Sequence, residues 1–482
     1  MSPGAASPAP NGRPNGASDG APDGTPDGTP GSTPGSTSDG TPGSTSDGTS
    51  GSTSDGTSDG TSGSTPGSTP GSTSSSTSSS APGTVPRDAR RDLRIAWSGL
   101  FAMACAMGIG RFAYTPVLPH MQADAALSTA MAGYVASANF IGYLIGAVLG
   151  SVGYFRPRRF GWAVSGVVAS IVTTAAMGWT GDPLAWSLLR LVSGIASAFV
   201  LIFGVSLVLE HLNRVERPMW AALAFTGVGL GIAVSAVIVD ACTRLGASSP
   251  SMWQVLAVAA LGSGVAAIRW MPSPASDPAA PGPVPPEPLS PLTRRTLRLA
   301  TIAYGGLGFG YVISATFIVV ITRQLQLGQW AETLVWVVTG LSAIPSNVLW
   351  LRCAQRWGFF KALMAAYAVE AVGVVLISLS TGMAGLLVGA VMLGSTFMAL
   401  TVLILGLGRQ LAPTHLHRIT GTTAAAFAIG QIAGPAVAGA MAERSGSFVL
   451  PSLIAGTVLL AALALTAIAE RGYRAGEPGR AA

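Results

Sequence analysis

Two arginines and one glutamate stand inside stretches of sequence that are otherwise apolar. Arg111 lies in a run that opens at Leu93, Arg190 lies in a second run, and Glu370 lies in a third. Placing a charge at the centre of a membrane helix costs about 2.5–3.5 kcal/mol on insertion scales, so such residues nearly always face a cavity or a partner. These three positions are therefore where chemistry is expected.

Arg111 offers a planar guanidinium fork that suits a carboxylate, phosphate or sulfate group. At about 1.5 Å per residue from Arg94, it lies roughly 25 Å along its helix, between the midplane and the outer surface of a bilayer. One interpretation places it in a cavity, where it binds an anionic substrate. The other has the side chain snorkelling to the outer headgroups, with Pro116 and Pro119 marking the helix end.

Glu370 is the one acidic residue deep in any apolar run, about 11 residues from Phe359. Removal from water favours the protonated form of a carboxyl group, and a proton-coupling site needs a carboxyl group of this kind. The alternative is a carboxyl group that stays protonated and hydrogen-bonded at a helix contact.

Four neutral polar residues also lie within apolar runs and are candidate substrate-binding residues: Tyr114, Asn139, Tyr311 and Gln431. Tyrosines at such places are also common in plain packing. The two amides could instead bond a neighbouring helix, and this alternative is the favoured one for Asn139.

The sequence shows no pattern of a metal, cofactor or catalytic site. Cys105, Cys242 and Cys353 are far apart and lack CxxC spacing, and the neighbouring His415 and His417 have no third ligand in sequence. The segments GVGLG and GIG are not nucleotide loops, because no Walker lysine follows them. A membrane enzyme should show His, Asp or Glu clustered at one membrane face. We therefore expect no cofactor, no metal and no enzyme activity.

Composition places these residues in an integral membrane protein. Of 482 residues, 49% are hydrophobic and 10% are charged, whereas about a quarter of a soluble domain is charged. The net charge of +6 could suggest nucleic acid, but the basic residues gather in loops at one membrane face, so topology explains them better. The expected partners are the lipid bilayer and a small-molecule substrate, and the expected oligomeric state is a monomer.

Twelve apolar runs, each long enough to cross roughly 30 Å of hydrocarbon, predict an all-α protein. The predicted spans are 94–118, 129–152, 161–180, 184–209, 217–240, 250–270, 297–321, 331–352, 359–380, 383–408, 417–441 and 447–470. The predicted organisation is a low-complexity, disordered Gly/Ser/Thr/Pro/Asp tail (1–88), a six-helix bundle (89–270), a proline-rich cytoplasmic linker (271–296), a second six-helix bundle (297–472) and a short cytoplasmic tail (473–482).

The basic residues predict the orientation. Twenty-one of the 27 Lys and Arg residues fall on one side, and only Arg244, Arg323 and Arg444 fall on the other. The positive-inside rule then puts both termini in the cytoplasm. The near absence of Lys and the excess of Ala and Gly favour a bacterial source, and therefore the inner membrane.

An internal repeat relates the two bundles. Shifted by 200 residues, MGIGRFAYTPVLP lies over LGFGYVISATFIV and pairs Gly108 with Gly308 and Arg111 with Tyr311. The second predicted helix has a glycine at every fourth position from Gly142 onward. This spacing predicts close approach by another helix. Two parallel repeats with a substrate site between them near the midplane are a known plan of transporters.

These segments resemble the major facilitator superfamily and, more narrowly, its YbfB/YjiJ-like branch. The resemblance covers about 93–470 and rests on GIGRFAYTPVLPHMQ, GYVASANFIGYLIGA and AFAIGQIAGPAVAG. LLRLVSGIASA is similar to the superfamily's arginine-then-glycine pattern, here Arg190 and Gly194. LRCAQRWGFFK resembles the loop signature but has Gln355 where an acidic residue is usual, and GYFRPRRFG departs further.

The resemblance implies the major facilitator fold, with twelve transmembrane helices in two pseudo-symmetric six-helix bundles, and a proton-coupled secondary transporter that works by alternating access. It also implies a place for Arg190 in the proton or substrate path, beside the alternative of an ion pair with Asp240. The predicted substrate-binding residues are Arg111, Tyr114, Asn139, Tyr311 and Gln431, and the predicted proton-coupling residues are Glu370 and Arg190. An efflux pump for neutral drugs or metabolites and a membrane sensor that moves no solute remain as alternatives.

Overall fold

The computed structural model describes residues 87–215, 218–273 and 288–476. Most of the predicted tail (1–88), much of the predicted linker (271–296) and most of the short C-terminal tail lie outside these ranges. Within them the chain contains 12 helical spans that are long and apolar enough to cross a membrane, as predicted.

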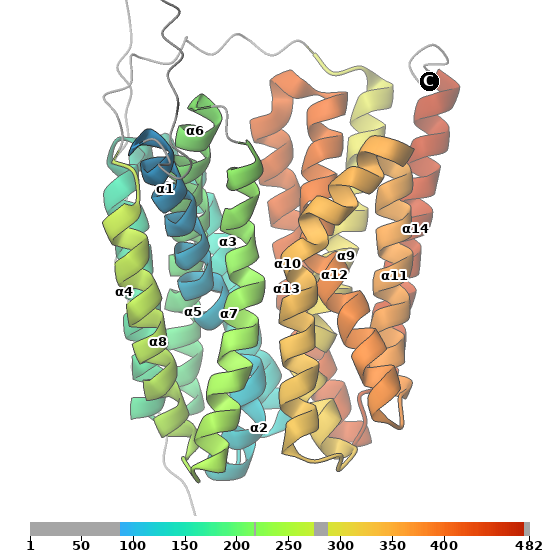
Figure 1. The fold of residues 1–482 in the computed structure, drawn as a ribbon. Coiled ribbons are helices and arrows are strands. Elements are labelled where there is room, and N and C mark those ends of the chain that lie inside the picture. Colours follow the sequence, from blue (N-terminus) through green and yellow to red (C-terminus); the bar gives the residue numbers. More distant parts are fainter. Residues whose placement is uncertain (1–86, 216–217, 274–287, 477–482) are drawn as a thin grey trace, which may run out of the picture. The chain divides into compact units, whose positions relative to one another are not determined.

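The first half of the chain forms six of these spans (Figure 1). Their helices are α1 (Arg87–Met103), the π-helix η1 (Ala104–Ile109) and α2 (Tyr114–Ala125); α3 (Thr129–Ser151); α4 (Arg159–Ala176) with the 3-10 turn η3 (Met177–Trp179); α5 (Pro183–Phe199), the π-helix η4 (Val200–Val205) and α6 (Ser206–Arg214); α7 (Pro218–Arg244); and α8 (Ser249–Trp270). A short 3-10 helix, η2 (Gly153–Arg158), links α3 to α4.

The second half forms the other six spans. They are α9 (Pro291–Gln324), α10 (Gln329–Trp357), α11 (Phe359–Leu379), α12 (Met383–Leu411), α13 (Leu416–Ser445), which follows the 3-10 turn η5 (Pro413–His415), and α14 (Val449–Gly476).

Several predicted boundaries differ from the structure by a few residues, and two of these differences have a local physical cause. The first span continues through Pro119 to Ala125, beyond the predicted end at 118. Pro116 falls in the first turn of α2, where a missing N–H costs nothing. α9 begins at Pro291, six residues before the predicted start at 297, because Ser290 caps it by accepting a hydrogen bond from the Thr293 N–H.

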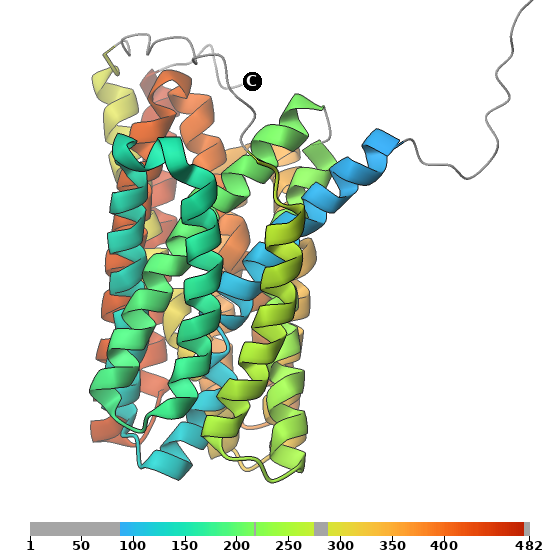
Figure 2. The same cartoon turned by 90° about the vertical axis from the view of Figure 1, so that its left-hand side faces the viewer.

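Equivalent helices pack in equivalent ways in the two halves. α3 packs on α5 in the first half as α10 packs on α12 in the second, and the halves meet where α3 contacts α13 and α7 contacts α10. Figure 2, turned by 90°, shows the first half facing the viewer with α1 running obliquely between its neighbours. The chain therefore has the predicted architecture of two pseudo-symmetric six-helix bundles.

Glycines set the closest of these contacts. A Cβ atom at Gly142 would overlap the carbonyl group of Leu191 on α5, which confirms the predicted close approach by another helix and shows that this helix is α5. Gly108 faces Gly231 on α7, and its repeat partner Gly308 faces the backbone of Phe427 on α13. The internal repeat thus corresponds to the same packing in both halves.

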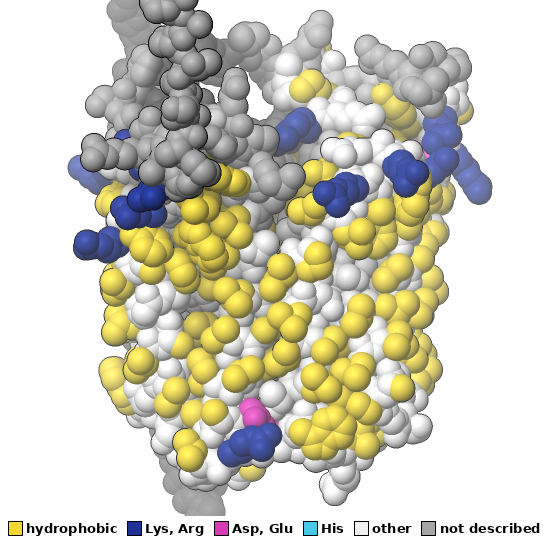
Figure 3. Space-filling model, in the orientation of Figure 1, with side chains coloured by type: hydrophobic (Ala, Val, Ile, Leu, Met, Phe, Trp, Pro, Cys, Tyr) yellow, Lys and Arg dark blue, Asp and Glu magenta, His cyan; other side chains and the backbone are white. Residues whose placement is uncertain are grey.

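The distribution of apolar and charged side chains on the surface is typical of a protein that lies in a lipid bilayer. Figure 3 shows a broad apolar face, Lys and Arg side chains at the end of the bundle where α14 ends, and a basic side chain beside an acidic one near the opposite end. We call these the arginine-rich and the arginine-poor ends.

Candidate functional site

The first span is interrupted at the depth of Arg111. The Gly110 N–H donates to the Cys105 carbonyl (2.8 Å) and the Phe112 N–H to the Met107 carbonyl (3.2 Å), both five residues back. These bonds belong to the π-helical turn that precedes α2. Such turns are frequent at functional sites, and irregular backbone at membrane depth occurs only where it is buried in protein or lines a cavity.

Arg190 on α5 satisfies the backbone of this interruption. Its Nη1 donates to the Gly110 carbonyl at 2.8 Å and its Nη2 to the Arg111 carbonyl at 2.7 Å. Ser193, one turn further along α5, adds a hydrogen bond to the Gly110 carbonyl at 3.0 Å. Arg190 is 3% exposed and lies 5.1 Å from the ring centroid of Tyr114. It therefore clamps the broken helix.

The alternative that paired Arg190 with Asp240 is wrong. Asp240 instead accepts a hydrogen bond from Arg244 Nε at 2.8 Å and further ones from Gln329 and Thr333 on α10. Asp240 lies at the arginine-poor end of α7, whereas the interruption that holds Arg190 lies deeper in the bundle.

Arg111 points into the protein. Its side chain is 3% exposed, and Nη2 donates to Oε1 of Gln431 at 2.9 Å. The guanidinium also lies 4.5 Å from the ring centroid of Phe140 and 4.6 Å from that of Tyr143, close enough for cation–π attraction. Snorkelling to the headgroups is therefore wrong, because the polar end of this arginine lies against α3 and α13.

Gln431 extends the contact of Arg111 into the second half. Its Nε2 donates to the hydroxyl group of Tyr311 on α9. The Tyr311 ring stacks on Phe397 and on Phe427, with centroids 5.5 Å and 5.7 Å away. The hydrogen bonds from Arg111 through Gln431 to Tyr311 thus join the two halves deep inside the protein, and the rings stacked on Tyr311 hold it in place.

Three of the predicted residues line one small cavity between the halves: Arg111, Tyr114 and Arg190, with Phe140 and Thr316 also in its wall. Gln431 and Tyr311 reach this site through Arg111.

Asn139 and Glu370 lie outside that wall. The Asn139 amide donates to the Arg190 carbonyl at 2.9 Å, an interhelical bond of the kind favoured for it. Glu370 is fully buried between α11 and α12, where the Thr396 hydroxyl contacts one of its carboxyl oxygens.

The cavity carries uncompensated positive charge. Among the described residues, no carboxylate forms an ion pair with Arg111 or Arg190; the ion pairs lie near the helix ends. Nε of each arginine also lacks a hydrogen-bond partner. The same part of the chain contains no group of three or more His, Cys, Asp and Glu residues that could hold a metal ion. The arrangement is therefore suited to binding an anion by arginine.

Sequence reasoning missed the aromatic groups around Arg111 and Tyr311. Phe140 and Tyr143 share α3 with Asn139, and Phe397 and Phe427 stack on Tyr311. No signal in an apolar run tells such a ring from one that faces lipid.

Comparisons with known proteins agree with this architecture. Residues 103–467 match the family described as "Uncharacterised MFS-type transporter YbfB". A search of the curated proteins finds no match. Among solved structures, the chain is similar to a crystal structure of a mutant of the nucleoside transporter NupG, with a TM-score of 0.60 and 13% identity, over 80% of this chain and 99% of that one. At that identity the likeness concerns the fold alone. The chain therefore belongs to the YbfB family of multi-pass membrane transporters in the major facilitator superfamily.

Proposed function

We propose that the protein is a secondary transporter that moves a small solute with an anionic group, such as a carboxylate, and that protons drive the transport. The observation that carries this proposal is the buried guanidinium of Arg111. Its polar contacts are the neutral amide oxygen of Gln431 at 2.9 Å and the sulfur of Met107 at 3.9 Å.

A buried cation that has only neutral partners is poorly compensated for the water it has lost. A carboxylate would bind the planar fork with two charge-assisted hydrogen bonds, each roughly twice as strong as a neutral one. It would displace Gln431, and so break the link from Arg111 to Tyr311 across the halves. A neutral drug would leave the charge uncompensated, which favours an anionic solute over efflux of neutral compounds.

Alternating access would follow from where the halves are bonded. Hydrogen bonds join them near Arg111 and toward the arginine-poor end, including Ser137 to the Ile432 carbonyl (2.8 Å) and the Ala130 N–H to Glu443 (2.6 Å). With the arginine-rich end in the cytoplasm of a bacterial cell, this state is sealed on the outer side. One chain carries both halves, so a monomer suffices.

Glu370 is the proposed coupling residue. The Thr396 hydroxyl contacts both the Glu370 carboxyl group and the Met392 carbonyl, the latter at 2.5 Å. A hydroxyl group has one proton, so both contacts are satisfied when the carboxyl group is itself protonated and donates to Thr396. The second carboxyl oxygen lacks a partner. When the carboxyl group is ionised, the Thr396 hydroxyl donates to it and no longer to the Met392 carbonyl, so protonation of Glu370 changes the acceptor of Thr396.

The test is an untargeted comparison of metabolites inside and outside cells that express the wild type, Arg111→Gln, Arg444→Gln or an empty vector. Arg444 is exposed at the arginine-poor end, so its variant controls for the loss of an arginine. We expect one or more anionic solutes to be redistributed by the wild type and by Arg444→Gln, and about 100-fold weaker apparent affinity in Arg111→Gln, from the roughly 3 kcal/mol that truncating a buried charge pair costs. A neutral solute, or equal transport by Arg111→Gln, would refute the anionic site. No redistribution by the wild type would favour a sensor.

A further inference from the structure

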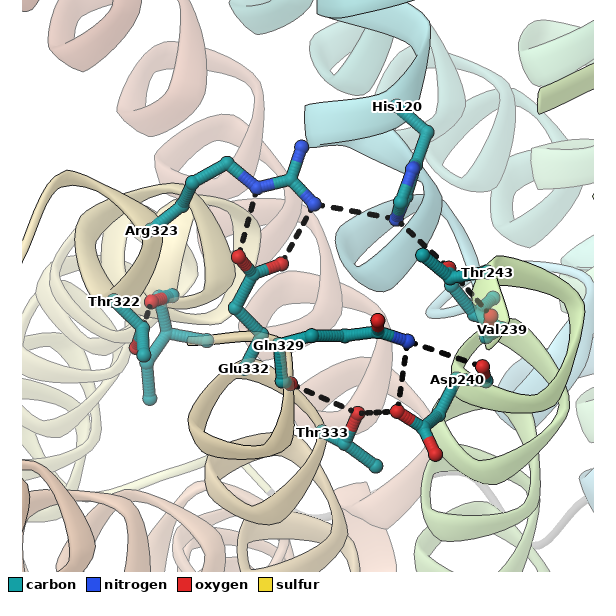
Figure 4. Close-up of polar contacts among 10 residues, drawn as sticks. His120, Val239, Asp240, Thr243, Thr322, Arg323, Gln329, Glu332 and Thr333 are labelled. Atoms are coloured by element: carbon teal, nitrogen blue, oxygen red, sulfur yellow. Dashed lines mark hydrogen bonds and ion pairs between the residues drawn. The ribbon is translucent and has the colours of Figure 1, made fainter. Parts of the chain in front are cut away.

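A second polar cluster joins the halves at the arginine-poor end (Figure 4). His120 near the end of α2 and Thr243 near the end of α7 belong to the first half. Arg323 near the end of α9 and Glu332 in the first turn of α10 belong to the second. Arg323 Nη2 lies 3.2 Å from His120 Nε2, and Arg323 also binds Glu332 with its Nε and Nη2, at 2.8 Å and 2.7 Å. None of these residues lines the cavity around Arg111.

The partners of His120 determine its protonation state in this structure. A guanidinium group has donors only, so Nε2 of His120 must accept the hydrogen bond from Arg323. The Thr243 hydroxyl lies 3.3 Å from the same nitrogen and is 2.8 Å from the Val239 carbonyl, its other acceptor. The imidazole is therefore neutral, with its proton on Nδ1.

We propose that His120 is a proton-binding site, and that proton binding there opens the arginine-poor end of the transporter. A proton on Nε2 removes the acceptor for Arg323 and places a second positive charge 3.2 Å from the guanidinium. The closed state shown here therefore requires the unprotonated imidazole. By linkage, the open state, in which His120 is free of Arg323, binds the proton more tightly, so acid shifts the halves toward it as the pH falls below about 6.5, the pKa of an ordinary histidine.

The other charged groups around His120 already have partners. Glu332 neutralises Arg323 on the second half. On the first half, Asp124 of α2 accepts from the Ser249 N–H at 2.6 Å, and Asp240 of α7 pairs with Arg244. Each of these carboxylates already has a cationic or N–H partner, whereas the His120 imidazole is neutral. His120 is thus the group of this cluster to which we assign the proton.

A second set of hydrogen bonds beside His120 also joins the halves, so the cluster has one contact that depends on protonation of His120 and one that does not. Asp240 accepts hydrogen bonds from Gln329 (2.9 Å) and Thr333 (3.1 Å) on α10. This link does not depend on protonation of a histidine, and together with His120 and Glu332 it lines one small cavity between the halves. Loss of the His120 contact therefore weakens the connection between the halves at this end without removing every hydrogen bond across it.

This inference deepens the proposed proton coupling and rests on alternating access, but its test needs no solute. Spin labels are placed at Leu245 and Trp330, which are 85% and 53% exposed and belong to opposite halves at this end. The full chain, with its native cysteines replaced by alanine, is purified into lipid nanodiscs, and the distance between labels is measured by double electron–electron resonance at pH 5.5 and pH 8.

In the wild-type background we expect the long-distance population to be at least threefold larger at pH 5.5 than at pH 8. His120→Gln, whose amide oxygen accepts from Arg323 without titrating, should keep the short distance at both pH values. His120→Lys, with a permanent charge, should show the long distance at both. Glu210→Gln, which removes an exposed carboxylate that pairs with Arg159 outside this cluster, is the matched control and should respond to pH as the wild type does.

A label-to-label distance that does not change with pH in the wild-type background would overturn the proposal. An unchanged pH response in His120→Gln or a short distance in His120→Lys would also overturn it. Because no solute is present, failure of the anionic site at Arg111 leaves these results unaffected.

Discussion

Arg111 and Gln431 lie 320 residues apart in the chain, and the Arg111 guanidinium donates to the Gln431 amide oxygen at 2.9 Å. The bond crosses from the interrupted first span to α13 of the other half. An anionic group on the substrate would compete with an amide for the same donors. Gln431 therefore occupies the place where the proposed substrate carboxylate would bind.

Gln431→Glu should put a permanent carboxylate on Arg111. We expect solute transport to fall at least tenfold, because an intramolecular anion then competes with the substrate, while thermal stability rises because a charge-assisted bond replaces a neutral one. The measurements are initial transport rates in cells and the unfolding temperature of the purified protein. Transport at the wild-type rate would contradict the assignment, and Gln431→Asn serves as a control that shortens the side chain without adding charge.

Glu370→Gln should uncouple transport from protons. The amide is nearly isosteric with a protonated carboxyl group but cannot release a proton, so accumulation driven by a pH gradient should fall about tenfold or more while exchange of solute across vesicles continues. Proteoliposomes with and without an imposed gradient separate the two activities. Glu210→Gln, at an exposed carboxylate that pairs with Arg159, should behave as the wild type. Unchanged pH dependence of transport in Glu370→Gln would refute the coupling role of Glu370.

Arg190→Gln should destabilise the protein more than Arg111→Gln does. The first variant leaves the Gly110 and Arg111 carbonyls without their guanidinium donors, and each buried group left unpaired costs about 1–3 kcal/mol. Arg111 by contrast donates to the side chains of Gln431 and Met107, which can reorient. Unfolding temperatures of both purified variants in one detergent test this order. A drop in Arg190→Gln equal to or smaller than that in Arg111→Gln would show that Arg190 does not clamp the interrupted helix.

Gly142→Ala should weaken the contact between α3 and α5. Its methyl group would overlap the Leu191 carbonyl, and overpacking of this kind costs about 1–3 kcal/mol. Gly262→Ala is the matched control, because a Cβ atom there meets nothing within 4 Å, and alanine is the better helix former. We expect a lower unfolding temperature for Gly142→Ala and an unchanged or higher one for Gly262→Ala. The reverse order would show that α3 can move away from α5 at little cost.

Much of the fold could be predicted from local features. Length and hydropathy identified the twelve spans, since the ability of a segment to cross a bilayer belongs to the segment itself. Neither π-helical turn was predicted. Gly108 and Gly110 carry no mark that distinguishes a π turn from a continuous helix, and the turn is stabilised by Arg190, which lies 80 residues from Gly110.

The buried charges show where prediction from the sequence ends. The sequence alone determined that Arg111, Arg190 and Glu370 lie at depths where a charge needs a partner, because the cost of a charge in hydrocarbon depends only on residue type and depth. Which partner each one has was decided by the tertiary structure. It placed Arg111 against Gln431 and excluded snorkelling, and it bound Arg190 to the carbonyls of the interrupted helix in place of Asp240. These partners lie on other helices, and only the packing of the helices brings them within hydrogen-bonding distance.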